Sequence, residues 1–280
     1  MKKWLLIPAF LFAVGITAGC SKQEPVPPKA PEAAPAATQE APAAAPAPVA
    51  ARKLVIGLDD SFPPMGFRDE KGEIVGFDID LAREAAKRMG AEAEFKAIDW
   101  KAKEAELMSK RIDLLWNGLT ITEERKQNIN FTSPYMENHQ IIVVVADSPI
   151  KTKADLKDKI VGVQEGSSAI SAIEKEPDVQ KSFSALNKYD DNVKALTDLS
   201  LGRLNAVVLD EVVGRYYVAK QPGKYLVLDD HFGAEEYGVG LRKDDTALLD
   251  ELNKALDAMK ADGAAAGIAQ TWFGKDVIKR

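Results

Sequence analysis

Short apolar runs alternate with amphipathic segments over most of this chain. The runs are four or five residues long, rich in leucine, isoleucine and valine, and lie at residues 53–57, 113–116, 160–163 and 206–209. Such runs are typical of strands buried on both faces. Between the first two runs, apolar residues recur at helical spacing on one stripe: Phe77, Leu81, Ala85 and Met89. Strands that alternate with helices predict an α/β body with a mostly parallel sheet.

The first residues of the chain do not follow this pattern. A basic start precedes an apolar core over residues 4–16, which is too short to span a bilayer, and small residues then lead to Cys20. We expect a signal peptide over residues 1–19, cut before Cys20, whose thiol is then lipidated and anchors the protein to a membrane. Thr17 stands where leucine is usual, so an ordinary signal peptide that ends at a cysteine stays open as the alternative.

Residues 20–52 are predicted to carry the lipidated cysteine and a linker. From residue 21 the linker consists mainly of proline, alanine, glutamine and glutamate. Such a stretch cannot bury enough apolar surface to offset its ordering entropy, and its prolines favour an extended spacer. We therefore expect a globular body that begins near Lys53 and is tethered to the extracytoplasmic or periplasmic face of a membrane.

Composition narrows the possible functions. The chain has 280 residues, enough for two lobes, and a formal net charge of −6. An acidic chain does not suit nucleic acid, whose phosphates need a basic face. With 2 His and 1 Cys, neither a structural zinc site nor a disulfide framework is expected, and no cofactor motif is present.

One segment, residues 117–125, carries the clearest chemistry. It follows the apolar run at 113–116 and reads as a loop that opens into a helix, with Thr122 as N-cap and acids in the first turn. Arg125 is then expected to point back from that turn towards the loop. An arginine fork beside free backbone amides is a carboxylate receptor. A capped helix with a solvated arginine is the structural alternative.

Other candidate residues also lie where strands are predicted to end. They are Asp59, Phe62, Trp100, Gln164, Ser168 and Asp210. Ligands of parallel sheets sit at the carboxyl ends of strands, and small residues at a helix N-terminus present amides to an anion. Each residue also has a structural alternative, such as core packing for Trp100 or a helix cap for Asp210. Their recurrence at equivalent places favours a shared cleft.

Four segments together resemble the extracellular solute-binding proteins of family 3, the polar amino acid receptors of ABC importers. They are residues 54–59 with Phe62, residues 75–81, residues 118–125 and residues 131–135. The resemblance covers the chain from Lys53 onwards. It implies a two-lobed, type II periplasmic-binding-protein fold with two crossing hinge segments. Residues 53–141 plus 237–280 are then expected to form one lobe and residues 142–236 the other.

The resemblance also implies a division of work in the cleft. Arg125, with the Thr120 and Ser168 amides, is expected to hold the α-carboxylate of a free L-amino acid. Asp210, the Thr120 hydroxyl and the Gly118 carbonyl are expected to hold its α-ammonium group. The remaining candidates surround the side chain: Phe62 and Trp100 would cover its aliphatic part, while Asp59 and Gln164 would meet its end. Trp272 and Phe273 resemble a C-terminal packing motif, and we expect them, with His139 and His231, to be structural.

The expected ligand is a polar amino acid, with cationic or neutral side chains ahead of acidic ones. Asp59 would repel a carboxylate, and neither the loop at 59–67 nor the loop at 164–168 offers a lysine or arginine. The expected partner is the permease of an ABC importer, served by a monomeric receptor. Two rival classes stay open: a periplasmic enzyme similar to cyclohexadienyl dehydratases, with Glu165 or Asp59 as general acid, and a ligand-presenting partner of a membrane sensor.

Overall fold

The structure, a computed structural model, describes residues 52–280, which lie within one structural unit. Its first sheet has the order β5-β1-β6-β13-β7. The strands of this sheet are β1 (Arg52–Leu58), β5 (Ala91–Ala97), β6 (Leu114–Leu115), β7 (Ile129–Phe131) and β13 (Gly240–Arg242). β1 is parallel to β5 and β6, while β13 is antiparallel to β6 and β7.

The second sheet has the order β10-β9-β11-β8-β12. Its strands are β8 (Met136–Val145), β9 (Ile160–Gln164), β10 (Ala185–Tyr189), β11 (Ala206–Asp210) and β12 (Tyr225–Tyr237). β9 is parallel to β10 and β11, whereas β8 is antiparallel to both of its neighbours. A small antiparallel sheet is added by β2 (Ser61–Phe62), β3 (Gly66–Arg68) and β4 (Ile74–Val75).

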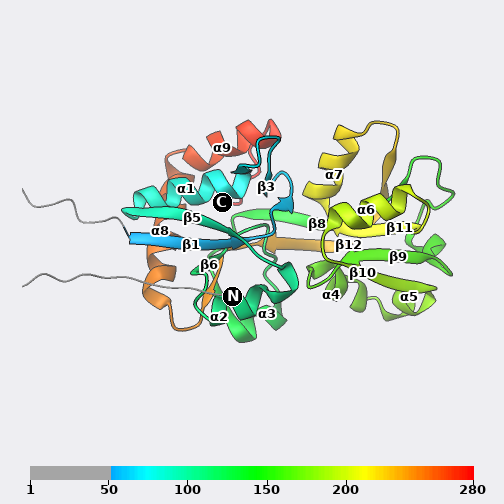
Figure 1. Ribbon diagram of the computed structural model, residues 1–280, viewed down its shortest axis with the longest axis horizontal. Helices are drawn as coiled ribbons and strands as arrows, with labels where there is room; N and C mark the ends of the chain where they lie inside the picture. The colour runs from blue at the N-terminus through cyan, green and yellow to red at the C-terminus, as the bar shows by residue number, and fades with distance from the viewer. Residues whose placement is uncertain (1–51) are drawn as a thin grey trace, which may run out of the picture. The chain divides into compact units, whose positions relative to one another are not determined.

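Helices cover both main sheets, and each sheet with its helices forms one of two lobes (Figure 1). The first lobe carries α1 (Phe77–Arg88), η1 (Trp100–Ala102), α2 (Lys103–Met108), α3 (Glu123–Asn128), α8 (Thr246–Ala261) and α9 (Ala264–Phe273). The second carries η2 (Lys153–Leu156), α4 (Ser168–Glu174), α5 (Pro177–Ser182), α6 (Asn192–Ser200) and α7 (Glu211–Lys220). The alternation of strands and helices predicted from the sequence is confirmed. The prediction of a mostly parallel sheet is wrong, because each of the two main sheets joins two parallel and two antiparallel strand pairs.

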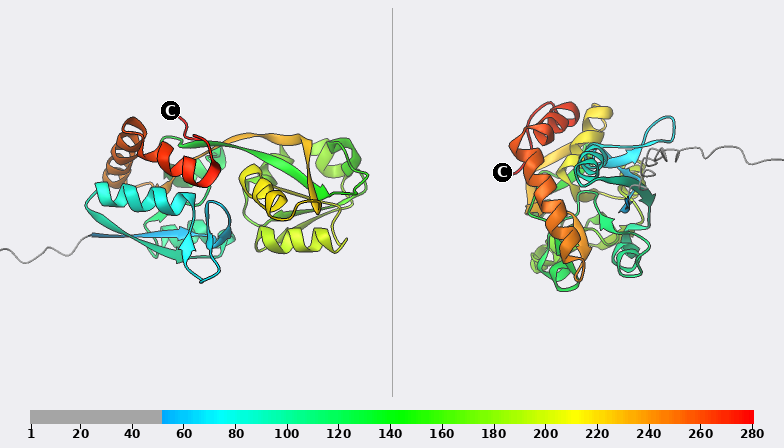
Figure 2. Two further views of the ribbon diagram at one scale, coloured as in Figure 1. Left: turned by 90° about the horizontal axis from the view of Figure 1, so that it is seen from above. Right: turned by 90° about the vertical axis from the view of Figure 1, so that its left-hand side faces the viewer.

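Two long strands, β8 and β12, cross between the lobes, as Figure 2 shows from above. At their first-lobe ends, isolated bridges pair Thr120 with Tyr237 and Met136 with Ile278. From there the two strands pair with each other along most of their length. The predicted two-lobed arrangement with two crossing segments is therefore present.

The predicted stripe of α1 is buried as expected. Phe77, Leu81 and Ala85 are each at most 1% exposed, because they face the first sheet and the C-terminal helices. Met89 is the C-cap instead of a helical residue, and Gly90 follows with a φ of +66°. The predicted packing motif also meets α1: the Trp272 indole N–H donates to Asp80 at 2.8 Å, and the ring centres of Phe273 and Phe77 lie 5.1 Å apart.

Three local details differ from the pattern in the sequence. The chain returns to the first sheet through two strands, because β12 ends at Tyr237 and β13 begins at Gly240. Asp245 stands at the N-cap position of α8 without capping it, since its carboxylate lies 2.7 Å from Arg242 Nε. The strand predicted at 113–116 is only Leu114–Leu115; the Asp113 carboxylate accepts instead from the Val55 backbone N–H.

The predicted signal peptide, Cys20 and the linker lie outside the described residues. Within residues 52–280, no helix is long and apolar enough to cross a membrane.

Candidate functional site

A buried carboxylate positions the loop that follows β6. Asp78 of α1 is fully buried, and its Oδ2 accepts from the Gly118 backbone N–H at 2.6 Å and from the Tyr135 hydroxyl at 2.9 Å. Burial raises the pKa of the Asp78 carboxyl to about 7. Gly118 has a φ of +57°, and a Cβ there would lie 3.0 Å from the Phe62 ring. Only glycine fits this turn without strain, so α1 and the turn together fix the loop's path.

Arg125 points back to this loop, as the sequence predicted. The Thr122 hydroxyl caps α3 by accepting from the Arg125 backbone N–H at 3.1 Å. The guanidinium then donates from one nitrogen to the Thr120 carbonyl at 2.8 Å and from the other to the Gly166 carbonyl at 3.1 Å. Arg125 is 7% exposed, and desolvation lowers the pKa of its guanidinium. The arginine fork therefore spans the two lobes.

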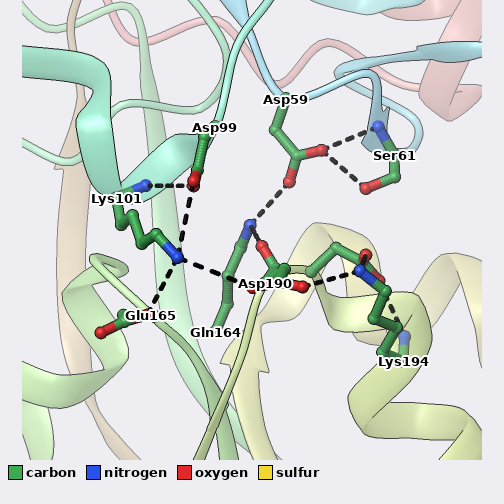
Figure 3. A network of polar contacts seen from close by, with 9 residues as sticks. Asp59, Ser61, Asp99, Lys101, Gln164, Glu165, Asp190 and Lys194 are labelled. Atoms are coloured by element: carbon green, nitrogen blue, oxygen red, sulfur yellow. Dashed lines mark hydrogen bonds and ion pairs between the residues drawn. The ribbon is translucent and has the colours of Figure 1, made fainter.

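Asp59 and Gln164 come together directly across the lobes (Figure 3). Gln164 Nε2 donates to Asp59 Oδ2 at 2.7 Å, while Asp59 Oδ1 accepts from the Ser61 backbone N–H and hydroxyl at 2.9 and 2.6 Å. The Asn192 side chain donates to Gln164 Oε1 at 3.1 Å. Burial raises the pKa of the Asp59 carboxyl, against the opposing effect of its hydrogen bonds. Both residues are buried where strands end, as predicted.

The acids next to these residues lie at the rim. Lys101 of η1 bridges Asp99 at 3.5 Å with Glu165 and Asp190 of the other lobe at 3.7 and 3.8 Å (Figure 3). Asp60 pairs with Arg68 outside the site at 2.5 Å. Exposed pairs of this kind contribute about 0–1 kcal/mol each. Asp59 is buried, whereas Asp60, Asp99, Glu165 and Asp190 lie at the rim.

Two aromatic rings form the apolar part of the site. Phe62 and Trp100 are 5% and 7% exposed. The Phe62 ring lies against the Gly118 turn, and Trp100 begins η1. Their burial is compatible with a cover for a ligand's aliphatic part and equally with core packing, the structural alternative.

Lys103 is a buried cation that the sequence reasoning missed. Its ammonium donates to the Gly166 carbonyl at 2.8 Å and to the Trp100 carbonyl at 3.3 Å, and it lies 5.1 Å from the centre of the Trp100 ring. Desolvation, followed by repulsion from Arg125, lowers its pKa to about 7. No local signal marks it, because a lysine on a short helix is normally exposed. The loops at 59–67 and 164–168 hold no basic residue, but Lys103 of α2 reaches the second of them at Gly166.

Thr120 and Ser168 meet where the lobes close. Their hydroxyl oxygens lie 2.9 Å apart. Ser167, one residue earlier than Ser168, is the N-cap of α4, so Ser168 is the first helical residue. Asp210 is 4% exposed, and its Oδ1 accepts from the Tyr237 hydroxyl at 2.6 Å. Although Asp210 is the N-cap of α7 by position, its side chain makes no capping hydrogen bond. It faces the hinge strands instead.

Glu235 is the second residue that the sequence reasoning missed. Its Oε1 accepts from the Thr120 hydroxyl at 2.9 Å, from Asn138 Nδ2 at 2.8 Å and from Gln140 Nε2 at 2.9 Å. An alternation signal was available, since Glu235 and Tyr237 are two residues apart in one strand and share a face. Side chains from both lobes and both crossing strands therefore meet at this carboxylate.

The two histidines remain outside this site. His139 Nδ1 lies 2.9 Å from Glu211, and the rings of His139 and His231 are 4.9 Å apart. Over residues 52–280, no group of three or more histidine, cysteine or acidic side chains is arranged to hold a metal ion.

The geometry defines a two-lobed receptor with buried, oppositely charged groups where its lobes meet. The chain belongs to the bacterial extracellular solute-binding proteins, family 3, which its residues 54–275 match. The predictions of the fold and of an extracellular substrate-binding receptor are confirmed by this membership.

Individual relatives agree with the family. The L-cystine-binding protein of Escherichia coli (strain K12) is 35% identical over 230 residues, which cover 81% of this chain and 84% of the relative. A substrate-binding protein of an ABC uptake transporter from Streptococcus pneumoniae, solved with bound histidine, is 36% identical with a TM-score of 0.79 and covers 81% of this chain and 95% of the relative. An ancestral arginine-binding protein, solved with glutamine, is 41% identical with a TM-score of 0.75, covering 80% and 98%. These relatives are binding proteins.

Proposed function

We propose that this protein captures a free polar L-amino acid between its lobes and delivers it to the permease of an ABC importer. The observation that carries the proposal is the placement of Arg125 and Asp210, a buried guanidinium and a buried carboxyl group contributed by different lobes. An α-amino acid is a zwitterion whose two charged groups match this pair. The amino acids that the relatives bind support the same chemical class.

In the proposed complex, Arg125 and the backbone amides of Thr120 and Ser168 hold the α-carboxylate. Asp210, the Thr120 hydroxyl and the Gly118 carbonyl hold the α-ammonium group. The first lobe, residues 53–141 plus 237–280, then contacts the same ligand as the second, residues 142–236. A ligand with contacts to both lobes stabilises the closed state, because the open state offers only part of them.

The ligand's side chain is proposed to run between Phe62 and Trp100 towards Asp59 and Gln164. A cationic side chain gains the Asp59 charge, and a neutral amide can donate to Asp59 while it accepts from Gln164. An acidic side chain meets Asp59 in a cleft of low dielectric, where like charges repel strongly. Lys103 reduces this repulsion, but its contacts are with the Gly166 and Trp100 carbonyls. Cationic and neutral ligands therefore stay ahead of acidic ones.

Calorimetric titration with the twenty amino acids and cystine tests the function and the preference together. We expect arginine, lysine, histidine, glutamine or cystine to bind most tightly. Tightest binding by glutamate or aspartate would overturn the preference while it leaves the function in place. No binding by any member of the panel would overturn the function.

The two rival classes have their own tests. The protein is proposed to hold its ligand without chemistry. Glu165, offered above as a general acid, has a side chain that is 43% exposed and paired with Lys101 at the rim, so it is not enclosed with a ligand. Production of phenylpyruvate from a cyclohexadienyl substrate would contradict the binding role. A pull-down from membranes that recovers a sensor kinase in place of a permease would favour the signalling role.

We propose that the mature protein is a monomer anchored through a lipidated Cys20 on the extracytoplasmic side of a membrane. The support is the small-residue sequence before this cysteine, the only one in the chain. In cells fed a labelled fatty acid, wild type should carry label and sediment with membranes, and Cys20→Ser should lose both. A wild-type protein without label would show that Cys20 ends an ordinary signal peptide.

A further inference from the structure

Two carboxylates flank β8 on one face of the second sheet. In the antiparallel registers, Asp210 of β11 pairs with Gln140, and Glu235 of β12 pairs with Asn138. Asn138 and Gln140 are two residues apart in β8, so their side chains point to the same face. The neighbouring strands therefore place all four side chains together. Because the four belong to one sheet, the arrangement does not depend on how the lobes close.

Neutral donors hold both carboxylates. Asn138 Nδ2 donates to Asp210 Oδ1 at 2.9 Å and also to Glu235 Oε1 at 2.8 Å, so one amide nitrogen lies between the two acids. Glu235 Oε1 also accepts from Gln140 Nε2 and the Thr120 hydroxyl, each at 2.9 Å, and from the Ser168 hydroxyl at 3.4 Å. Within residues 52–280, the hydrogen bonds of these two carboxylates come from neutral groups. The site thus has two acids in contact range and no basic side chain bonded to them.

Such a pair favours a bound proton. Burial raises the pKa of the Asp210 carboxyl well above its usual range, and the charge of Glu235 raises it further. Gln140 Oε1 is also buried and has no hydrogen-bond partner within residues 52–280. Gln140 is 0% exposed, so this oxygen is an acceptor that water does not satisfy from outside. An electron-rich site of this kind suits a cation with several N–H groups.

Space adjoins the pair on the Glu235 side. A cavity of about 500 Å³ has Thr120, Gln140, Ser168 and Glu235 in its lining. Arg125 and Asp210 are not part of that lining. Glu235 therefore lines this cavity and also contacts Thr120, a residue of the proposed amino acid site.

We propose that Glu235 is a second carboxylate of the receptor for the ligand's α-ammonium group, and that this group displaces the proton held by Asp210 beside Glu235. The inference rests on the proposed function. The ammonium carries three N–H donors, which Asp210, Glu235 and the Gly118 carbonyl can accept, while the Thr120 hydroxyl donates to Glu235 and orients that carboxylate. The displaced proton leaves to solvent, so capture of one amino acid releases up to one proton.

Other charged groups face this site and contribute to its proton balance. Arg125 lies on the opposite lobe with Glu104 and Glu124 near it, and Tyr237 donates to Asp210. Burial lowers the pKa of Lys103 in the closed state to about 7, so Lys103 keeps its proton well below that pH. Measurements of proton release between about pH 5 and about pH 6 therefore leave Lys103 charged. The contribution of Asp59 cancels when a variant is compared with wild type.

The experiment measures proton release by calorimetry in buffers of different ionisation enthalpy, with L-arginine and L-glutamine as probes. Wild type should release protons on binding, with an affinity that rises by up to about tenfold per pH unit. Glu235→Gln keeps the shape and removes the charge. It should lose most of the release and bind about tenfold more weakly at about pH 7, the loss expected for a charged hydrogen bond. Glu236→Gln is the matched control, because the carboxylate of Glu236 pairs with Lys279 and contacts neither Asp210 nor Arg125.

Each outcome decides the inference. Wild-type affinity and proton release in Glu235→Gln would overturn it, and so would weaker binding with unchanged proton release, which marks a structural acceptor. If Glu235→Gln does not fold, Asp210→Asn gives the second test, since proton release that persists without Asp210 also overturns the inference. Failure of the proposed function is distinct, because wild type itself would then bind no amino acid.

Discussion

Replacing Arg125 tests the proposed carboxylate receptor most directly. The guanidinium is 7% exposed, and its two donated hydrogen bonds, at 2.8 and 3.1 Å, end on carbonyls of different lobes. Arg125→Ala removes the only charge that we propose for the α-carboxylate and leaves both carbonyls without this donor. Arg125→Lys should also weaken binding, because a single ammonium lacks the planar fork.

The size of the expected affinity loss follows from the burial of the ion pair between Arg125 and the ligand's α-carboxylate. Removing one partner of a buried ion pair costs about 3–5 kcal/mol, since the other charge stays desolvated without compensation. At about 1.4 kcal/mol per factor of ten, affinity should fall between about 100-fold and about 4,000-fold. Calorimetry with the tightest ligand of the amino acid panel measures this loss. Lys126→Ala is the matched control, because Lys126 is the next residue of α3 and pairs with Glu123 at the surface.

A second ligand separates carboxylate binding from lobe closure. The amide of the same amino acid has no α-carboxylate, so it should bind wild type poorly and gain nothing from Arg125. A double-mutant cycle of wild type and Arg125→Ala with both ligands gives the coupling between guanidinium and carboxylate. Coupling near zero, or an Arg125→Ala protein within a few-fold of wild type, would refute the reasoning. Arg125 would then only link the lobes through Gly166.

Three further predictions follow from the packing around the cleft. Opening the lobes returns Lys103 to water, so closure should release its proton between about pH 7 and pH 10.5. Ligand affinity measured by calorimetry should therefore rise with pH over this window in wild type, and this rise should be absent in Lys103→Met. Gly166→Ala should weaken binding by about tenfold or more, because a Cβ at this positive-φ residue would lie 2.9 Å from the Lys101 Cα; Gly202→Ala, with a φ of +72° and nothing within 4 Å, should leave affinity unchanged in the same titration. The raised pKa of Asp78 means that the folded state holds a proton which the unfolded state lacks between pH 3.8 and about 7, so stability falls as pH rises through this window. Asp78→Asn should therefore gain up to about 4 kcal/mol relative to wild type across it, and equal pH profiles in denaturant unfolding would contradict this.

Most of the fold was predictable from local pattern. The run at residues 206–209 and the stripe through Phe77 and Leu81 carry their periodicity in the chain itself, and each became the predicted strand or helix. Boundaries were less certain where a side chain has a partner other than the one that the local rule assigns to it. Asp245 has the residue type of an N-cap, yet Arg242 binds its carboxylate instead. Arg242 is itself held by the Ile112 carbonyl and the Asp113 carboxylate, which are 130 and 129 residues away, so a cap rule that reads neighbouring positions cannot anticipate this competition.

Part of the site was also predictable, because its geometry is local. Thr122 caps α3, and the cap aims Arg125 back at its own loop within one helical turn. Asp59 and Gln164 were predicted separately, each from the end of a strand. Their direct contact at 2.7 Å required the two lobes to come together.

The sequence by itself determined the class of this protein: its periodicity predicts an α/β body, and its resemblance to family 3 implies a two-lobed receptor with Arg125 on one lobe and Asp210 on the other. Periodicity, turn residues and strand ends are written in neighbouring positions, so they can be read before folding. Only the tertiary structure decided that Lys103 lies buried at the Gly166 carbonyl and that Glu235 lies beside Asp210 across β8. Both residues look like ordinary surface charges in the chain, because their burial depends on contacts between distant segments. Lys103 contacts Gly166, 63 residues away. Asn138 of β8 joins Asp210 and Glu235, which are 72 and 97 residues away from it.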